Sequence, residues 1–160
     1  MSRGWVVAAA VVLVASCSRA TAPPATAGPP PARLRGLDFS AALDVMESSP
    51  IELSGEVRVA NRGKGPETLV FADGCPVRLR VYEIRGTRVA PVWEGPGTCP
   101  ETPLTLAIAP GESATVAIPT TSAREILGDH LSDGRYRITV WLTPDDRVIE
   151  IEGGEVELSR

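Results

Sequence analysis

An alternation of aliphatic and polar side chains between residues 51 and 61 constrains the fold of this chain more than any other feature. In Ile-Glu-Leu-Ser-Gly-Glu-Val-Arg-Val-Ala-Asn, the large aliphatic residues fall on one parity and the charged residues on the other. Successive side chains of a β-strand point to opposite faces, so the pattern predicts a strand with one buried and one solvated face. Residues 61–66 predict a turn, because Asn and Gly tolerate positive φ and Pro ends a ladder.

The same pattern of half-buried strand and polar turn recurs downstream. The alternating segments 104–108 and 114–118 flank Ala109-Pro110-Gly111-Glu112, and this arrangement predicts a hairpin. Gly153-Gly154 predicts a bulge or break in the last strand. With the strand at 51–60, the expected strands cover residues 37–47, 67–72, 77–84, 88–93, 104–108, 114–118, 136–142 and 147–158.

Eight or nine short strands, spaced by roughly ten residues, predict an all-β fold, an immunoglobulin-like antiparallel β-sandwich. The 160 residues suffice for one domain and an appendage, and 15 Gly with 15 Pro favour short strands over long helices. One exception is Ser122-Ala123-Arg124-Glu125, which matches a capping box and predicts one or two helical turns ending at Gly128. Such a core needs no cofactor for its stability.

A tyrosine marks the entrance to the penultimate strand. The segment Asp133-Gly134-Arg135-Tyr136 resembles the tyrosine corner of immunoglobulin-like sandwiches, in which the phenol bonds back to nearby backbone. We therefore expect a structural role for Asp133, Gly134 and Tyr136.

Residues 1–16 predict a lipoprotein signal peptide. They combine a basic start with an apolar run over residues 4–15, which as a helix rises about 18 Å and is too short for a hydrocarbon core of roughly 30 Å. Val14-Ala15-Ser16-Cys17 resembles the bacterial lipobox, which implies cleavage before Cys17 and acylation of Cys17. Several acyl chains on one residue give durable membrane anchoring. The alternative is an ordinary signal peptide followed by an incidental cysteine.

Residues 17–36 are expected to hold the lipidated cysteine and a disordered linker rich in Pro and Ala. The segment has one large aliphatic residue and no periodicity, so it is predicted to act as an extended spacer of about 3 Å per residue. A proline-rich recognition peptide is the alternative. Ser18 in place of aspartate predicts the outer membrane as the location in a bacterium with two membranes. The folded domain is expected over residues 37–160.

Composition and motifs argue against several classes of function. A net charge of −4 speaks against nucleic acid as a partner, because phosphate binding needs clustered positive charge. The one histidine, His130, belongs to no His-x-x-His metal spacing and no nucleophile motif, and the chain has no Gly-rich phosphate loop. We therefore predict a protein that is not an enzyme and that has no metal site or cofactor.

The cysteines other than Cys17 are Cys75 and Cys99, and an even pair in an exported domain predicts a disulfide. A redox or metal-binding pair is the alternative, but the chain has no Cys-x-x-Cys. The disulfide would brace the loop over residues 94–103, and a braced loop suits recognition. Its alternative role is only to tie down a long connection. The candidate partner-binding residues of this region are Trp93, Glu94, Pro96, Thr98 and Pro100.

Several motifs of the domain together resemble one known family: Gly-Glu-Val-Arg-Val-Ala-Asn at 55–61, Glu-Thr-Leu-Val-Phe at 67–71, Val-Tyr-Glu-Ile-Arg-Gly at 81–86, Val92-Trp93, Ala-Pro-Gly-Glu at 109–112 and Gly-Arg-Tyr at 134–136. With these motifs, the domain resembles the bacterial intracellular proteinase inhibitor (BsuPI-like) family over residues of about 51–142. The resemblance implies an immunoglobulin-like sandwich and, by the family's name, inhibition of serine proteinases. It identifies no reactive-site residue in this chain.

Together these features predict an exported bacterial lipoprotein, held in the cell envelope by Cys17, that presents a β-sandwich to a protein partner. The resemblance makes a serine proteinase the first partner to consider. The alternative is a structural or assembly module of the cell envelope without inhibitory activity, which would bind through a sheet edge or face.

Overall fold

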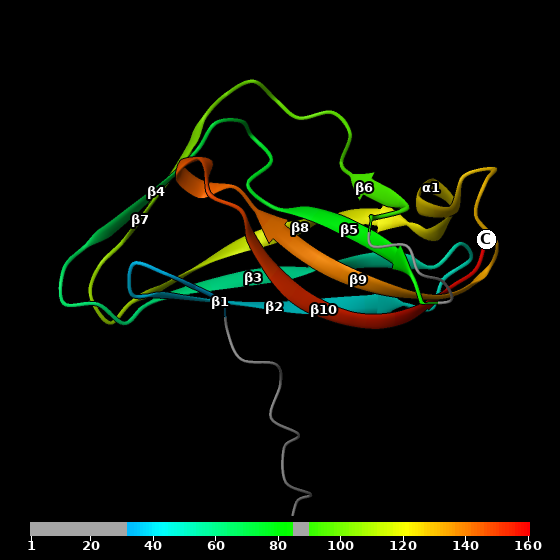
Figure 1. Ribbon diagram of the computed structural model, residues 1–160, viewed down its shortest axis with the longest axis horizontal. Helices are drawn as coiled ribbons and strands as arrows, with labels where there is room; N and C mark the ends of the chain where they lie inside the picture. Colours follow the sequence, from blue (N-terminus) through cyan, green and yellow to red (C-terminus); the bar gives the residue numbers. More distant parts are fainter. Residues whose placement is uncertain (1–31, 85–89) are drawn as a thin grey trace, which may run out of the picture.

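The computed structural model describes residues 32–84 and 90–160, and in this part of the chain it confirms the predicted all-β sandwich (Figure 1). All strand pairs are antiparallel. The described residues form ten strands, slightly more than the eight or nine predicted: β1 (Ala32–Leu34), β2 (Leu37–Met46), β3 (Glu52–Asn61), β4 (Glu67–Phe71), β5 (Arg78–Glu83), β6 (Trp93–Gly95), β7 (Leu104–Ile108), β8 (Ser113–Ser122), β9 (Gly134–Leu142) and β10 (Ile149–Leu158).

Two four-stranded sheets form the layers of the sandwich. The first sheet has the order β1-β2-β3-β8 and the second has the order β10-β9-β5-β6, while β4 and β7 make a separate two-stranded ribbon at one end (Figure 1). The core lies between the sheets, where Phe39 and Val57 of the first sheet and Leu79 and Ile138 of the second are buried. At one corner β10 passes beside β2, and a Cβ at Gly153 would clash with Leu43.

The linker is shorter than predicted, because residues 32–36 belong to the fold. Ala32 pairs with Phe39 and Leu34 pairs with Leu37, so β1 is an edge strand of the first sheet. Leu34 is buried, and Arg35 and Gly36 take positive φ in the tight turn to β2. Strand β1 was not predicted from the sequence, because it is only three residues long and shows no periodicity.

The alternation that begins at residue 51 does form a central strand. Leu53, Val57 and Val59 of β3 are buried, as predicted. The turn after β3 is held by the buried side chain of Asn61, whose Nδ2 donates to the carbonyl oxygens of Gly65 (2.9 Å) and Ile108 (3.0 Å). The predicted turn at 61–66 is therefore tied to the end of β7.

The predicted hairpin between 104–108 and 114–118 is wrong. Both segments are strands, but β7 pairs with β4 and β8 pairs with β3. The chain over residues 52–71 runs antiparallel to residues 104–122, and the two are joined at the bend by backbone bonds from Asn61 N to Glu112 O (2.9 Å) and from Gly111 N to Asn61 O (3.0 Å). Because each segment finds a distant partner, the Pro-Gly turn links two ribbons instead of closing a hairpin.

The strand predicted over residues 88–93 is also displaced. Residues 85–89 lie outside the described residues, and residues 90–92 are not in a strand. The strand is β6, so Trp93, Glu94 and Gly95 belong to the edge of the second sheet and the loop begins only at Pro96. The reason is the pairing partner, because Leu79–Val81 of β5 align with Trp93–Gly95.

The predicted helical turn is α1 (Ala123–Leu127), in which Ser122 Oγ accepts a hydrogen bond from Glu125 N (3.2 Å) and Gly128 ends the helix with positive φ. The inward row of β9 is buried as predicted, and the register of β10 shifts around Gly153 at the predicted bulge. A short 3₁₀ turn, η1 (Pro144–Asp146), joins β9 to β10. In the described residues, neither helix has the length and apolar character needed to cross a membrane.

Candidate functional site

The outer face of the second sheet carries a compact group of aromatic, basic and acidic side chains, which we call the β5-β9 face. Because the intervening residues Leu79, Val81, Ile138 and Val140 point into the core, the alternate residues point outward. The β5-β9 face consists of Arg78, Arg80 and Tyr82 on β5, Arg137, Thr139 and Trp141 on β9, Glu150 and Glu152 on β10, and Glu94 on β6.

Trp141, near the end of β9, lies beneath two guanidinium groups of this face. The Cζ atom of Arg80 is 4.1 Å and that of Arg78 is 5.4 Å from the centroid of the indole ring. Although its side chain is on the outer face, Trp141 is only 8% exposed. Cation–π contacts of this kind contribute about 0.5–2 kcal/mol and favour a fixed arrangement of the arginines.

Glu150 of β10 connects outward side chains of β5 and β9. Its Oε1 accepts hydrogen bonds from the Tyr82 hydroxyl (3.0 Å) and from Thr139 Oγ1 (2.7 Å). Burial raises the pKa of the Tyr82 phenol, and the hydrogen bond to Glu150 raises it further. Tyr82 is therefore a neutral hydrogen-bond donor at physiological pH, and Arg137 lies over its ring with Cζ 4.6 Å from the centroid.

Arg80 is held from both sides by carboxylates. Its Nε donates to Glu94 Oε2 (2.8 Å), and its NH1 lies 3.9 Å from Glu150 Oε2. Burial by itself would lower the pKa of Arg80, but the hydrogen bond and the charge of Glu94 outweigh it, so the pKa is raised. The guanidinium is therefore permanently charged and fixed in position.

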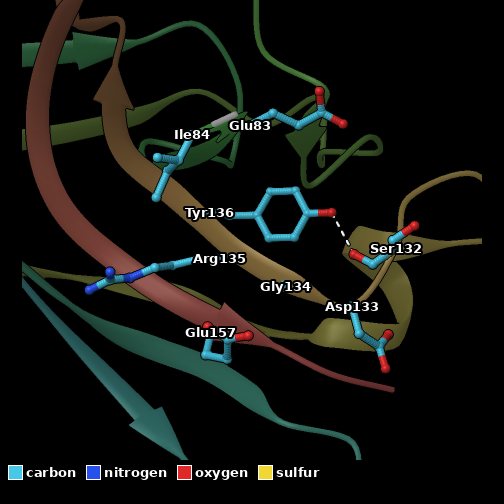
Figure 2. Close-up of a pocket in the computed structure, with 8 residues that line it drawn as sticks. All are labelled: Glu83, Ile84, Ser132, Asp133, Gly134, Arg135, Tyr136 and Glu157. Carbon is cyan, nitrogen blue, oxygen red and sulfur yellow. Dashed lines mark hydrogen bonds between the residues drawn. The ribbon is translucent and has the colours of Figure 1, made fainter. Parts of the chain in front are cut away.

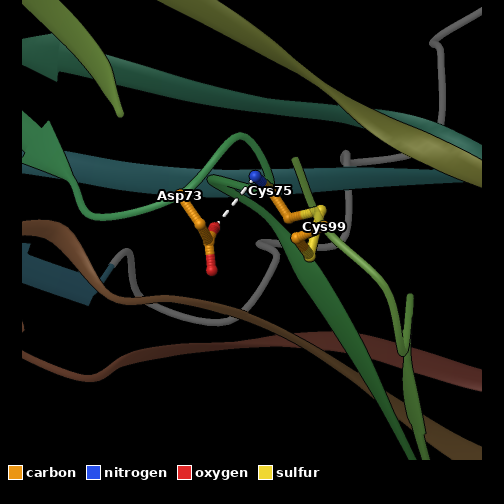
Figure 3. A group of neighbouring side chains, drawn as sticks. All are labelled: Asp73, Cys75 and Cys99. Atoms are coloured by element: carbon orange, nitrogen blue, oxygen red, sulfur yellow. Dashed lines mark hydrogen bonds between the residues drawn. A yellow bond between two sulfur atoms is a disulfide. The ribbon is translucent and has the colours of Figure 1, made fainter. Parts of the chain in front are cut away.

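The predicted disulfide between Cys75 and Cys99 is present and ties residues 96–100 to the start of β5 (Figure 3). Gly74 N donates to Pro100 O (2.8 Å), and a Cβ at Gly74 would lie 2.9 Å from the Pro100 ring. Asp73 Oδ1 accepts from Cys75 N (2.9 Å), while Asp73 Oδ2 pairs with Arg78. The braced loop is thus continuous with the β5-β9 face.

Asp73, Cys75 and Cys99 each offer one atom within 4.8 Å of the others, a spacing that resembles a metal site. The two sulfur atoms are bonded to each other, so neither is a thiolate that can ligate a metal. Asp73 is also engaged by Arg78. In this oxidised state the cluster is structural.

The structure divides the residues predicted for the partner-binding loop. Trp93 aligns with the buried Val81, packs against the core, and covers Gly95 so closely that a Cβ there would clash with the indole ring. It is therefore a half-buried packing residue and not an exposed anchor. Glu94 points outward to Arg80, and Pro96 is half-buried. Thr98 and Pro100 are exposed on the braced loop.

Arg78, Arg80, Tyr82 and Trp141 were not among the binding residues predicted from the sequence, although a signal for them was present. Arg78, Arg80 and Tyr82 share the outer parity of their strand, as Trp141 does on β9. Parity shows which face a side chain occupies but not which strand lies beside it. Only the register, which aligns Arg78 with Trp141, brings the outward side chains of β5 and β9 together.

A half-open hollow of about 500 Å³ lies at the end of the second sheet, beside the predicted tyrosine corner (Figure 2). The Tyr136 hydroxyl donates to Ser132 O (2.6 Å), as a tyrosine corner requires. Asp133 is paired with Arg160, and Gly134 has positive φ at the strand entrance. The lining is Glu83, Ile84, Ser132, Asp133, Gly134, Arg135, Tyr136 and Glu157.

Tyr136 and Asp133, two of the ionisable residues that line this hollow, have structural partners. Burial raises the pKa of the Tyr136 phenol, and the nearby charges of Glu83 and Asp133 raise it further. Arg160 donates to Asp133 and to the carbonyl oxygens of Gly128 and Leu131. The hollow therefore lies beside the tyrosine corner, where Tyr136 and Arg160 hold the connection between α1 and β9 in place.

No protein-family model matches this chain, and no curated protein matches it. Among solved structures, it is similar to the beta-glucosidase from Kluyveromyces marxianus in complex with glucose, at 16% identity and a TM-score of 0.45, over 76% of this chain and 14% of that chain. The beta-glucosidase from Listeria innocua in complex with gluconolactone gives 16% identity and a TM-score of 0.38, over 72% and 16%.

A third similar structure is beta-glucosidase 3B from Thermotoga neapolitana in complex with glucose, at 16% identity and a TM-score of 0.40, over 77% of this chain and 17% of that chain. The chain thus spans less than a fifth of the length of each of these enzymes. At such TM-scores these similarities carry no argument about what this protein does.

Proposed function

We propose that this protein is an exported lipoprotein, anchored through Cys17, whose β5-β9 face and braced loop bind a protein partner. The observation that carries the proposal is the arrangement of Trp141 and Tyr82 beneath three arginines on an outward sheet face. Trp, Tyr and Arg are the residues that dominate the energetics of protein interfaces. A face of purely solvated residues would not need such a fixed arrangement.

The rigidity of the face supports binding. Arg80 is held by Glu94 and Glu150, and Arg78 is held by Asp73 beside the disulfide. Side chains that are already fixed lose little conformational entropy when a partner binds. Arg78 Nε and Trp141 Nε1 are buried donors without a hydrogen bond in the described residues, and such donors are few in folded proteins.

Substitution of one arginine tests the proposal. Arg80→Ala removes the group over Trp141, and Arg58→Ala is the matched control, because Arg58 lies on the outer face of the other sheet and bonds to a neighbouring side chain, Ser113. We expect crosslinking of the anchored protein in native membranes to yield a defined partner with wild type and Arg58→Ala, and a several-fold lower yield with Arg80→Ala. Equal yields from all three proteins would contradict the proposal.

The class of partner is tested separately. The resemblance to the BsuPI-like family supports a serine proteinase as partner, so purified protein is titrated against a panel of secreted serine proteinases. Stoichiometric inhibition that Arg80→Ala weakens and Arg58→Ala retains would support an inhibitor. Partner capture without inhibition of any proteinase would favour the alternative, a structural or assembly module of the cell envelope.

A further inference from the structure

Strand β8 forms an edge of the first sheet that is bare in the described residues. It pairs with β3 on one side, and no described strand pairs with its other side. The opposite edge of the same sheet is partly covered, because β1 pairs with the start of β2 and β10 passes beside β2 near Leu43. The two edges therefore differ in what shields them (Figure 1).

Strand β8 contains no charged residue of its own, and the nearest charge in contact with it is Arg58 of β3, which bonds to Ser113 Oγ. The sequence of β8 is Ser-Ala-Thr-Val-Ala-Ile-Pro-Thr-Thr-Ser, without an acidic or basic residue. Exposed edges are ordinarily protected by charged side chains, proline or bulges, because their free N–H and C=O groups accept another strand. Here Pro119 and the register shift beside it protect only the far end of β8. Residues 113–118 remain as an unprotected edge.

An aliphatic row on this edge is incompletely buried. Val116 aligns with Val57 of β3, and Ala114 aligns with Val59. The two β3 residues are fully buried, whereas Val116 and Ala114 pack against the core but stay half-exposed. The aligned residues share one face of the sheet and differ in whether a further strand lies beside them. A strand added to β8 would complete this burial.

We propose that β8 pairs antiparallel with β8 of a second copy, which joins the two first sheets into one continuous sheet across a two-fold axis. In such a pairing the row of Ser113, Thr115 and Ala117 meets its own copy, and so does the aliphatic row. No like charges then face each other across the strands. The uncharged strand β8 can therefore pair with β8 of a second copy without charge repulsion between the two strands.

The expected affinity is low in dilute solution, because a single strand edge buries less surface than a stable dimer interface. Membrane anchoring, which rests on the proposed function, would hold both copies in one membrane and raise their effective concentration. The β5-β9 face belongs to the other sheet, so it stays free in the dimer. Pairing at β8 and partner binding at Arg80 are therefore separable by experiment.

Single cysteines in the full chain test the pairing. Cys75 and Cys99 are already joined, so an added cysteine at residue 113, 115 or 117 provides a free thiol for a short bismaleimide in native membranes. Ala42→Cys is the matched control, because Ala42, Glu56 and Ala117 lie in one row across the same face. We expect a band of twice the mass from the β8 positions, strongest nearest the two-fold axis, and none from Ala42→Cys.

A charge on the edge provides the second arm. In the Ser113→Cys protein, Ala117→Lys should lower the yield of crosslinked dimer by about tenfold, since each copy brings one lysine into the paired edges, whereas Ala42→Lys should not lower it. Equal crosslinking at residues 42 and 117, or crosslinking of β8 to a different protein, would overturn the proposal. The same cysteine scan on a Cys17→Ser protein at raised concentration tests β8 pairing without the anchor. It thus separates failure of the proposed membrane anchoring from failure of the proposed β8 pairing.

Discussion

At the scale of single residues, the two tyrosines show how one residue type serves two purposes. Tyr136 donates to Ser132 O and closes the corner before β9, whereas Tyr82 donates to Glu150 on the β5-β9 face. Both are nearly buried, and burial is the largest cause of the raised pKa of each phenol. Both therefore stabilise the fold in their neutral form.

This predicts how stability depends on alkaline pH. Because the folded-state pKa of each phenol is above its ordinary value of about 10, the contribution to the free energy of unfolding is complete below pH ~10 and is lost as pH rises through the raised values. Tyrosinate absorbance should therefore appear above pH ~10, together with a lower urea midpoint. Tyr136→Phe should remove one of the two transitions. Ionisation of both phenols at their ordinary pKa, with no loss of stability, would contradict this.

At the scale of elements, the disulfide crosslinks two connecting segments whose flanking strands are paired with each other, β4 with β7 and β5 with β6. It joins the segment between β4 and β5 to the loop between β6 and β7, across a sequence separation of 24 residues. Arg78 reaches this junction through Asp73, so the elements beside the disulfide also position the β5-β9 face. Loss of the disulfide should thus lower both the free energy of unfolding and the binding of the partner.

The double variant Cys75→Ala/Cys99→Ala should lower the free energy of unfolding by about 3 kcal/mol, because the unfolded chain regains the freedom of a loop of this length. Urea denaturation of the purified protein measures the change. Partner capture should also weaken. Thr98→Ala, in the same exposed loop, keeps the disulfide and should unfold at the wild-type midpoint. A double variant as stable as wild type would show that other contacts hold this junction.

At the scale of the whole molecule, the first described strand and the candidate face belong to different sheets. The described chain enters through β1 in the first sheet, whereas the β5-β9 face is the outer surface of the second sheet (Figure 1). If extended, residues 17–31 reach roughly 45 Å. Such a tether would leave the face open to a partner in the surrounding compartment.

The anchor itself gives the last prediction. Cys17→Ser should abolish incorporation of labelled fatty acid and release the protein from the membrane fraction, because the acyl chains provide the membrane affinity. Ser18→Ala keeps the cysteine and should remain labelled and bound. Wild-type protein that takes up no fatty acid would show that residues 1–17 are an ordinary export signal.

The sequence by itself determined the features that depend on near neighbours. Alternation over a few residues identified β3 and β9, the Ser122 cap identified α1, and the paired Cys75 and Cys99 identified the disulfide. Each signal is local, since side-chain parity, cap chemistry and cysteine count need no knowledge of distant strands. The short β1 was missed because three residues are too few to show a period.

Tertiary structure decided everything that depends on which strands lie side by side. It paired β7 with β4 in place of the predicted hairpin, turned Trp93 toward the core, and placed Arg80 over Trp141. These outcomes follow from backbone pairing between segments far apart in the chain, and a periodic pattern fixes the face of a strand without fixing its neighbour. For this protein, the candidate binding face exists only because of that choice of neighbours.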